Sequence, residues 1–264
     1  MNRPFAVVTG ASSGVGVELA KQFAQHGYDL LITAEDGDVE HIAADLKQHG
    51  VLVYAFLADL SVYSGVESLI EQIEASGRPV DAIAINAGMG VSGDFAETNL
   101  EDEIRMIQLN VVSTVHLAKR LVQDMVERRR GRVLFTSSIA STMPAPYLSV
   151  YGATKSFVQS FALSLREELK DTGVSVTALL PGPTNTQFFA RAGMEDTKAG
   201  AQDKYDNDPA DVARQGFEAL MAGKEQVIAA SWKTKVRGVF NKVLPESLKA
   251  RQHAKSAAPG SARH

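Results

Sequence analysis

A tyrosine and a lysine stand four residues apart in the stretch Tyr151-Gly-Ala-Thr-Lys155, and Ser138 lies thirteen residues upstream. Positions i and i+4 share one face of a helix. A phenol and an ammonium side by side form an acid/base pair, because the cation favours the phenolate and lowers the tyrosine pKa from about 10 towards working pH. A hydroxyl such as that of Ser138 then holds a substrate oxygen against the phenol. Taken alone, the pattern also describes an aromatic residue beside a solvated lysine, so its interpretation depends on the rest of the chain.

The composition indicates one large globular domain without cysteine chemistry. The chain has 264 residues, of which 45% are hydrophobic, and this suits a single α/β domain with a substantial core. It has no cysteine, which excludes disulfides and thiolate sites, and its six histidines form no metal-binding pattern. No apolar run approaches the roughly 20 residues of a membrane span, and the first residues lack the apolar core of a signal peptide. We therefore expect a cytoplasmic protein that holds no metal.

The charge is distributed unevenly. Residues 231–264 carry eight Lys or Arg and one acid, a net charge of +7, which leaves −11 for residues 1–230 within the total of −4. An acidic body argues against a nucleic-acid partner.

The C-terminal part predicts two further segments. Residues 231–253 predict a basic amphipathic helical extension, and residues 254–264 a disordered tail. The apolar stripe of the extension comprises Trp232, Val236, Val239, Phe240, Val243 and Leu244. This stripe can cover the substrate pocket, pack on a partner subunit or rest on an anionic membrane surface, and packing within the protein or an oligomer is favoured over the membrane.

Short β-branched runs alternate with stretches of helical period along residues 1–230, and no linker interrupts them. The predicted strands are 5–9, 28–33, 51–57, 82–85, 132–136, 174–180 and 226–229. The predicted helices are 15–26, 39–49, 66–75, 99–128, 150–170 and 209–221. Continuous apolar strands that alternate with helices predict a mostly parallel sheet covered on both faces. The expected fold is a single doubly wound, Rossmann-type, three-layer α/β/α domain with seven strands.

A glycine-rich turn, Thr9-Gly10-Ala-Ser-Ser-Gly14-Val-Gly16, follows the first strand and opens the first helix. We expect Gly10 to allow the tight turn, Gly14 to let a pyrophosphate approach the backbone, and Gly16 to allow close packing of the helix. The free N–H groups and the positive end of the helix dipole then face the phosphates. Three glycines directly after the first strand favour dinucleotide binding over a plain turn.

The Gly-x-x-x-Gly-x-Gly spacing, with the Ser/Tyr/Lys set, resembles the compact branch of the short-chain dehydrogenase/reductase family over about residues 4–230. Asp59-Leu60, Asn86-Ala87-Gly88 and the Pro-Gly segment at 181–186 resemble its adenine, ribose and nicotinamide contacts, with Ile85 where the family often has a second Asn. The residues that this resemblance implies for cofactor binding are Gly10, Ser12, Ser13, Gly14, Val15, Gly16, Glu35, Asp59, Leu60, Asn86, Ala87, Gly88, Tyr151, Lys155, Pro181, Gly182, Thr184 and Thr186.

The resemblance implies an oxidoreductase that moves a hydride between a nicotinamide and a carbonyl or secondary alcohol. It implies that Tyr151 is the general acid/base, that Lys155 supports the phenolate and binds the nicotinamide ribose, and that Ser138 holds the reacting oxygen. Asn110, in Leu-Asn-Val, resembles the fourth catalytic residue and would keep a water that links the lysine to solvent. Ser137 is the alternative to Ser138, and a helix bend or cap is the alternative role for Asn110.

The end of the second strand, Ile32-Thr33-Ala34-Glu35-Asp36, decides between NAD and NADP. An acid there binds the ribose diol and repels a 2′-phosphate, whereas an arginine accepts that phosphate. Glu35 and Asp36 therefore favour NAD. The family's diol-binding Asp usually falls at the position of Ala34, so NADP remains open, as does a solvated position for both acids.

Apolar residues in three segments predict the substrate pocket. They are Met89, Val91 and Phe95 after the fourth strand, Met143, Pro144 and Tyr147 before Tyr151, and Phe188, Phe189 and Met194 after the Pro-Gly segment. Arg191 is the only basic residue near enough to bind a carboxylate, so we expect an uncharged, apolar substrate. Because family members are commonly dimers or tetramers joined through the helices at about 100–128 and 150–170, the resemblance also implies a homo-oligomer.

Two other functions occur on similar folds. A dinucleotide-binding regulator that senses redox poise should tolerate loss of the tyrosine or lysine, and this chain keeps both. An epimerase or dehydratase with bound NAD usually has a larger C-terminal domain. The intact Asn/Ser/Tyr/Lys set favours the oxidoreductase, which fold alone would not do.

Overall fold

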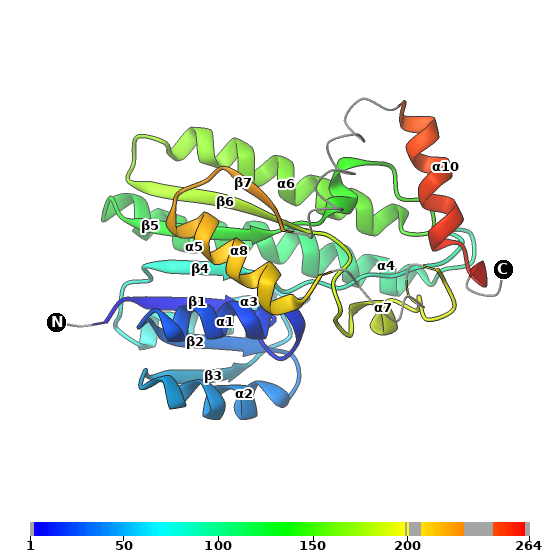
Figure 1. Ribbon diagram of the computed structural model, residues 1–264. Coiled ribbons are helices and arrows are strands. Elements are labelled where there is room, and N and C mark those ends of the chain that lie inside the picture. The colour runs from blue at the N-terminus through cyan, green and yellow to red at the C-terminus, as the bar shows by residue number, and fades with distance from the viewer. Residues whose placement is uncertain (1–2, 199, 201–206, 230–244, 262–264) are drawn as a thin grey trace.

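The computed structural model describes residues 3–198, 200, 207–229 and 245–261 (Figure 1). Its strands are β1 (Phe5–Thr9), β2 (Asp29–Ala34), β3 (Val53–Leu57), β4 (Ala82–Ile85), β5 (Gly131–Thr136), β6 (Val174–Pro181) and β7 (Gln226–Ala229). They form one seven-stranded sheet in the order β3-β2-β1-β4-β5-β6-β7, and every neighbouring pair is parallel.

The sheet lies between two layers of helices. The helical elements are α1 (Gly14–Gln25), α2 (Asp38–Leu46), η1 (Lys47–His49), α3 (Tyr63–Ala75), α4 (Leu100–Ile107), η2 (Gln108–Val112), α5 (Ser113–Glu127), η3 (Ile139–Thr142), α6 (Ser149–Leu169), α7 (Phe188–Arg191), α8 (Pro209–Met221) and α10 (Glu246–Ala257). Phe5 and Val7 of β1 pack against α3, α5 and α6, whereas Ala6 and Val8 pack against α1, α2 and α8. Because successive strand residues point to opposite faces, a sheet covered on both sides needs continuous apolar strands. The predicted three-layer α/β/α fold is confirmed.

The strand order reverses between β1 and β4. The chain winds outward from β1 to β3, returns through α3 to β4, and then winds outward to β7. Asn86 ties the strand ends together at this point: its Nδ2 donates to the Thr9 carbonyl oxygen at 3.2 Å, and Thr136 Oγ1 donates to its Oδ1 at 3.0 Å. Ligands of open α/β sheets bind in the crevice outside the carboxyl ends of the strands at such a reversal.

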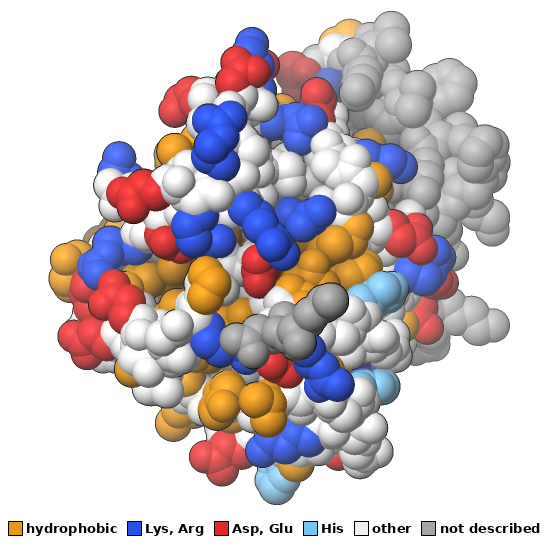
Figure 2. Space-filling model, turned by 90° about the vertical axis from the view of Figure 1, so that its left-hand side faces the viewer, with side chains coloured by type: hydrophobic (Ala, Val, Ile, Leu, Met, Phe, Trp, Pro, Cys, Tyr) orange, Lys and Arg blue, Asp and Glu red, His pale blue; other side chains and the backbone are white. Residues whose placement is uncertain are grey.

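The amino ends of the strands, opposite the carboxyl ends, form a charged surface. Figure 2 shows this face, where Lys and Arg side chains gather among Asp and Glu. Arg130 and Asp81, which directly precede β5 and β4, form an ion pair at 3.2 Å, and Arg78 pairs with Asp29 at the start of β2 at 2.8 Å. These ion pairs link the segments that lead into β2, β4 and β5.

One predicted helix is interrupted. The sequence predicts a continuous helix over 99–128, but α4 ends at Ile107 and a π-helical turn, η2, precedes α5. A π-helical turn of this kind is a single-turn insertion within a helical segment, so the residues on both sides of it are helical as predicted. The other predicted elements of residues 1–230 are present, with ends that move by at most three residues.

The C-terminal helix α10 lies beyond the carboxyl ends of the strands (Figure 1). The apolar stripe predicted within 231–244 lies outside the described residues. The prediction of a disordered tail from residue 254 onward is wrong for 254–257, because these residues belong to α10 and Ala257 is only 1% exposed against an apolar cluster. In the part of the chain that the structure describes, no helix has the length and apolar character needed to cross a membrane.

Candidate active site

Tyr151, Ser138 and Lys155 meet at the carboxyl edge of the sheet. The Ser138 side chain lies close enough to the Tyr151 hydroxyl for hydrogen bonding to act on the tyrosine pKa. Lys155, one turn further along α6, donates to the Thr136 carbonyl oxygen at 3.0 Å, and its Nζ lies 5.9 Å from the centroid of the Tyr151 ring. The tyrosine is 8% exposed and the lysine 5%. The structure thus brings the three predicted residues together.

Ser137 and Ser138 point in different directions. Ser137 Oγ donates to the main-chain carbonyl oxygen of Lys155 at 2.7 Å, so this hydroxyl supports the backbone of α6. Ser138 Oγ accepts from the Ala140 N–H at 3.1 Å, and Ser138 has extended dihedral angles at the start of η3. Because neighbouring residues of an extended segment face opposite sides, only Ser138 reaches Tyr151.

Burial dominates the ionisation of the tyrosine and the lysine. It raises the pKa of Tyr151 to about 12, although the hydrogen bond with Ser138 acts in the lowering direction. Burial also lowers the pKa of Lys155 to about 8. The prediction that the lysine brings the tyrosine pKa down is therefore wrong for this structure, because desolvation of the phenolate outweighs any stabilisation by the cation. Tyr151 carries its proton at neutral pH, which is the state that a general acid requires.

Asn110 lies in the π-turn η2 and joins three segments behind the lysine. Its side chain Nδ2 donates to the Met89 carbonyl oxygen at 2.9 Å and to Thr154 Oγ1 at 3.0 Å, while its Oδ1 accepts from the Met89 N–H at 3.0 Å. Thr154 Oγ1 donates in turn to the Tyr151 carbonyl oxygen at 2.8 Å. Asn110 therefore occupies a helix irregularity and also supports the first turn of α6, whereas its part in a water link from the lysine to solvent stays a prediction.

The glycine turn forms a cradle next to these residues. Gly10 has φ +67°, which favours glycine, and a Cβ on Gly16 would lie 1.9 Å from the Gly10 carbonyl oxygen. Helix α1 begins at Gly14 with no side-chain cap and no acidic residue in its first turn. Its first N–H groups are thus left without a side-chain acceptor, an arrangement that suits a phosphate. Thr186 borders this turn, since a Cβ on Gly14 would lie 2.9 Å from Thr186 Cγ2.

The side chains of several other predicted cofactor residues are directed into the protein. Val15 and Leu60 pack their side chains into the core. Thr184 is buried, and its Oγ1 donates to the Gly182 carbonyl oxygen at 2.7 Å. Gly182 directly follows Pro181, the last residue of β6. These side chains shape the carboxyl edge, and their part in cofactor binding stays a prediction.

Arg105, on α4, is a candidate residue that no sequence pattern indicated. Its Nη2 lies 2.6 Å from Glu35 Oε2 at the end of β2, and 3.5 Å from Asp59 Oδ2 beyond β3. Its Nε donates to Ser61 Oγ at 3.4 Å. Burial raises the pKa of Asp59, but the hydrogen bonds from Ser61 and the charge of Arg105 outweigh this and lower it overall. Glu35 is 70 residues away along the chain, so no local spacing reveals the pair.

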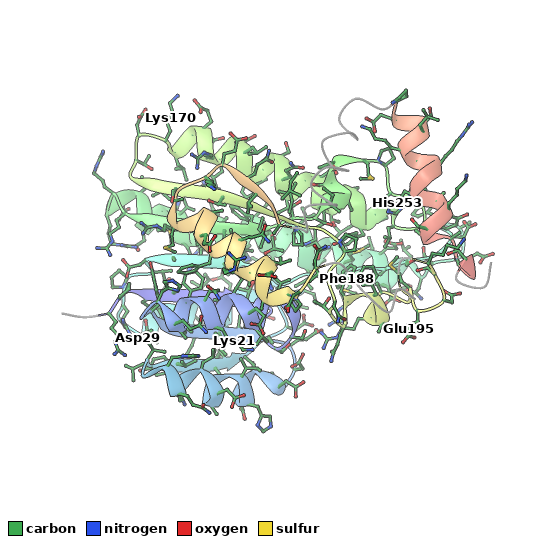
Figure 3. All side chains as sticks on the ribbon, in the orientation of Figure 1. Lys21, Asp29, Lys170, Phe188, Glu195 and His253 are labelled. Atoms are coloured by element: carbon green, nitrogen blue, oxygen red, sulfur yellow. The ribbon has the colours of Figure 1, made fainter. Side chains whose placement is uncertain are left out.

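Apolar side chains surround Tyr151. The Phe188 and Tyr151 ring centroids are 5.1 Å apart, and Figure 3 shows Phe188 beyond the carboxyl ends of the strands. The other predicted wall residues in this cluster are Met89, Val91, Tyr147, Phe189 and Met194. Together they make one side of the site apolar.

Three predicted wall residues lie elsewhere. Phe95 is 67% exposed on the loop before α4. Met143 and Pro144 line a separate cavity of about 420 Å³ with Gly152 and Ala153 of α6. The face of α6 that borders this cavity differs from the one that carries Tyr151, so a place for Met143 in the wall of the substrate pocket stays a prediction.

The C-terminal helix completes the apolar cluster. Ala257 packs into it, and His253 Nδ1 lies 3.2 Å from the Pro146 carbonyl oxygen, in the loop that leads to α6 (Figure 3). Burial lowers the pKa of His253, although this contact acts in the raising direction. Beyond the helix, the Gly260 N–H donates to Asp196 Oδ2 at 2.9 Å. The residues just past α10 therefore contact the segment that follows α7.

The chain is similar to known oxidoreductases. A family model described as short chain dehydrogenase matches residues 4–196. Probable oxidoreductase EphD of Mycobacterium tuberculosis is 33% identical over 189 residues, which cover 71% of this chain and 32% of that protein, so the chain spans about a third of the length of this relative. Sulfoacetaldehyde reductase 2 of Chromohalobacter salexigens is 32% identical over 199 residues, 74% of this chain and 79% of that protein. A short-chain dehydrogenase from Sphingobium yanoikuyae in complex with NADPH has a TM-score of 0.79 and 28% identity, and the match covers 94% of this chain and 99% of that one.

Proposed function

Because the chain belongs to the short-chain dehydrogenase family, we propose that it is an NAD(P)-dependent oxidoreductase that interconverts a carbonyl compound and a secondary alcohol. One observation carries the proposal: Tyr151 is buried next to Ser138, with Lys155 one helical turn away at the carboxyl edge of the sheet. An acid, an oxygen-holding hydroxyl and a cation in one apolar site are the groups that a carbonyl reduction needs.

The carboxyl edge of the sheet fits a nicotinamide dinucleotide. The uncapped start of α1 suits a pyrophosphate, and Glu35 and Asp36 at the end of β2 favour the ribose diol of NAD over a 2′-phosphate. When bound, this cofactor supplies or accepts the hydride. We propose NAD as the preferred form. Because the similar protein from Sphingobium yanoikuyae is a complex with NADPH, both forms belong in any test.

The side chains of the site manage the proton. During reduction, Tyr151 donates its proton to the substrate oxygen, and its raised pKa keeps that proton available at neutral pH. Ser138 donates a hydrogen bond to the same oxygen and stabilises the negative charge that develops there. Lys155, while protonated, stabilises the phenolate that remains. In the direction of oxidation, the phenolate accepts the proton of the alcohol.

We propose that the substrate is uncharged and apolar near the reacting carbon. Support comes from the apolar cluster around Tyr151, to which Phe188 and Phe189 contribute. Arg191 is the basic residue nearest in sequence to Phe188 and Phe189, but its guanidinium is bound to other side chains. Its Nη1 donates to Ser13 Oγ at 3.4 Å, and its Nη2 donates to Gln187 Oε1 at 2.9 Å. Arg191 is therefore not placed to bind a substrate carboxylate in the pocket.

A homo-oligomer, either a dimer or a tetramer, is part of the proposal. Val112 of η2, Val115 of α5 and Phe157 of α6 are 45%, 36% and 41% exposed, and apolar side chains along neighbouring helices suit burial against a second copy. Sedimentation equilibrium measures the mass in solution, and a monomer at micromolar concentrations would contradict this part of the proposal.

A panel of ketones and secondary alcohols, each with NAD(H) and NADP(H), tests the activity at the nicotinamide absorbance. The matched variant is Tyr151→Phe, which keeps the ring against Phe188 but removes the hydroxyl. We expect turnover to fall by about 10²- to 10⁴-fold while cofactor binding is retained. Full activity in this variant would refute the role of Tyr151. A protein that binds neither NADH nor NADPH in titration calorimetry would refute the dinucleotide function.

A further inference from the structure

Arg105 of α4 lies beside the end of β2 and changes the electrostatics of cofactor selection there. Glu35 and Asp59 both face the guanidinium of Arg105, at 2.6 Å and 3.5 Å. Asp36 is occupied separately, because it accepts from Ser12 Oγ at 2.9 Å. The acids that favour NAD are therefore accompanied by an arginine, the residue type that binds a 2′-phosphate.

We propose that Arg105 and Glu35 together set the choice between NAD and NADP, and that Arg105 is a latent 2′-phosphate ligand that Glu35 holds. The inference rests on the proposed dinucleotide function and names the residues that tune it. Glu35 directly follows the last residue of β2, where the adenine ribose of a Rossmann-type fold lies. Arg105 thus stands within reach of the one group that distinguishes NADP from NAD.

The backbone that carries Arg105 is held firmly, whereas its guanidinium is accessible. Met106, the next residue on α4, is fully buried. The Arg105 side chain is 47% exposed and that of Glu35 is 53% exposed, so solvent or a ligand reaches both. Among the described residues, the polar partners of Arg105 are Glu35, Asp59 and Ser61, and the contact with Ser61, at 3.4 Å, is long. A guanidinium has five N–H donors, so this one retains donors for a phosphate.

The two charges act in opposite directions on the same phosphate. A 2′-phosphate brings negative charge next to Glu35, which repels it and competes with it for Arg105. Removal of the Glu35 charge leaves Arg105 with Asp59 at the longer distance, and the guanidinium then binds the phosphate. Removal of Arg105 leaves the acids without their cation, and the phosphate is rejected more strongly.

The test uses AMP and adenosine 2′,5′-bisphosphate, two ligands that differ by the 2′-phosphate and need no turnover. Titration calorimetry on the full chain compares wild type, Glu35→Gln, Arg105→Gln and the double variant. We expect Glu35→Gln to raise affinity for the bisphosphate relative to AMP by about tenfold. The double variant should lose that gain, and Arg105→Gln alone should weaken the bisphosphate while AMP affinity stays within about twofold.

The matched control is Arg214→Gln on α8. Arg214 is 49% exposed and ion-paired with Asp211 at 3.1 Å and Glu218 at 2.9 Å, so the variant makes the same charge change in a similar ion pair away from β2. It should leave the ratio of the two affinities unchanged.

Two results would overturn the inference. One is a gain in bisphosphate affinity that persists in the double variant, since loss of negative charge alone would then explain it. The other is a Glu35→Gln protein with the wild-type affinity ratio. Failure of the proposed function looks different, because wild type would then bind neither NADH nor NADPH.

Discussion

Lys155 donates a hydrogen bond from its ammonium to the main-chain carbonyl oxygen of Thr136 at 3.0 Å, and this bond ties α6 to the end of β5. The acceptor is neutral and the ammonium is buried, so burial lowers the lysine pKa to about 8. The residue that supports Tyr151 therefore titrates just above neutral pH, whereas Tyr151 itself keeps its proton.

The first prediction concerns the pH dependence of catalysis. Carbonyl reduction should run at a constant rate below the pKa of Lys155 and decline as pH rises through about 8, because the neutral amine no longer stabilises the phenolate left on Tyr151. The measurement is kcat/KM for reduction across this range. Lys155→Met should be slow and should show no such decline. A wild-type rate that stays constant through this range would contradict the assignment.

The second prediction concerns stability. The lysine pKa is about 8 in the folded chain against an ordinary 10.5, so between these values the unfolded chain binds more protons and stability rises with pH. Burial of the charged ammonium costs on the order of 3 kcal/mol below this window. Lys155→Met should therefore be more stable than wild type at neutral pH by about 1–2 kcal/mol, since the lost bond to Thr136 offsets part of the gain.

Urea unfolding of both proteins at several pH values checks this prediction. Tyr151 is common to both proteins, and its pKa is raised from 10 to about 12 in the folded chain. Between these pH values the folded chain binds more protons than the unfolded chain, so the stability of both proteins falls as pH rises. The difference between the two proteins should shrink as pH rises from 8 to 10.5. A constant difference would show that Lys155 is not the titrating group.

The third prediction concerns Asn110. Asn110→Ala leaves the buried Thr154 hydroxyl and both main-chain groups of Met89 without their partner, and should cost about 2–4 kcal/mol of unfolding free energy together with a lower kcat. Thr154→Val removes a smaller part of the network and should cost about 1–2 kcal/mol. The double variant should lose less than the sum, because the residues share a bond. Strictly additive losses would argue that the network does not act as a unit.

The fourth prediction compares two glycines. A Cβ on Gly16 would lie 1.9 Å from the Gly10 carbonyl oxygen, so Gly16→Ala must push α1 away from the turn. We expect a loss of about 2–3 kcal/mol in stability and weaker binding of both cofactors. Gly37 has φ −69°, and a Cβ there would meet no atom within 4 Å, so Gly37→Ala should change stability by less than about 1 kcal/mol. Equal effects of the two changes would rule out the packing explanation.

The fifth prediction concerns Arg191. Its Nη1 lies 3.4 Å from Ser13 Oγ, just before the start of α1, where a pyrophosphate fits. Arg191→Ala should weaken NADH and NADPH equally, by about three- to tenfold, and the loss should shrink at high salt. Arg191→Lys should keep part of the affinity. A loss confined to one cofactor would move Arg191 to the ribose end, where we place Arg105.

Much of the fold and of the central site followed from short segments of sequence. The Tyr151/Lys155 spacing, the glycine turn and the alternation of strands and helices are local patterns, and each describes residues within one or two turns or strands. The position of Ser138 rather than Ser137 also followed from spacing, and the extended backbone at that point places the two hydroxyls on opposite sides.

The sequence by itself determined the three-layer α/β/α fold and the motifs at the carboxyl ends of its strands, because apolar periodicity and turn residues act over a few positions. The tertiary structure alone decided the contacts between distant segments: the ion pair of Arg105 with Glu35, the outward position of Phe95, and the packing of Ala257 on the apolar cluster. It also decided the pKa values of Tyr151 and Lys155. Such properties depend on which strands become neighbours and on how much water they exclude, and neither is written in the spacing of residues along the chain.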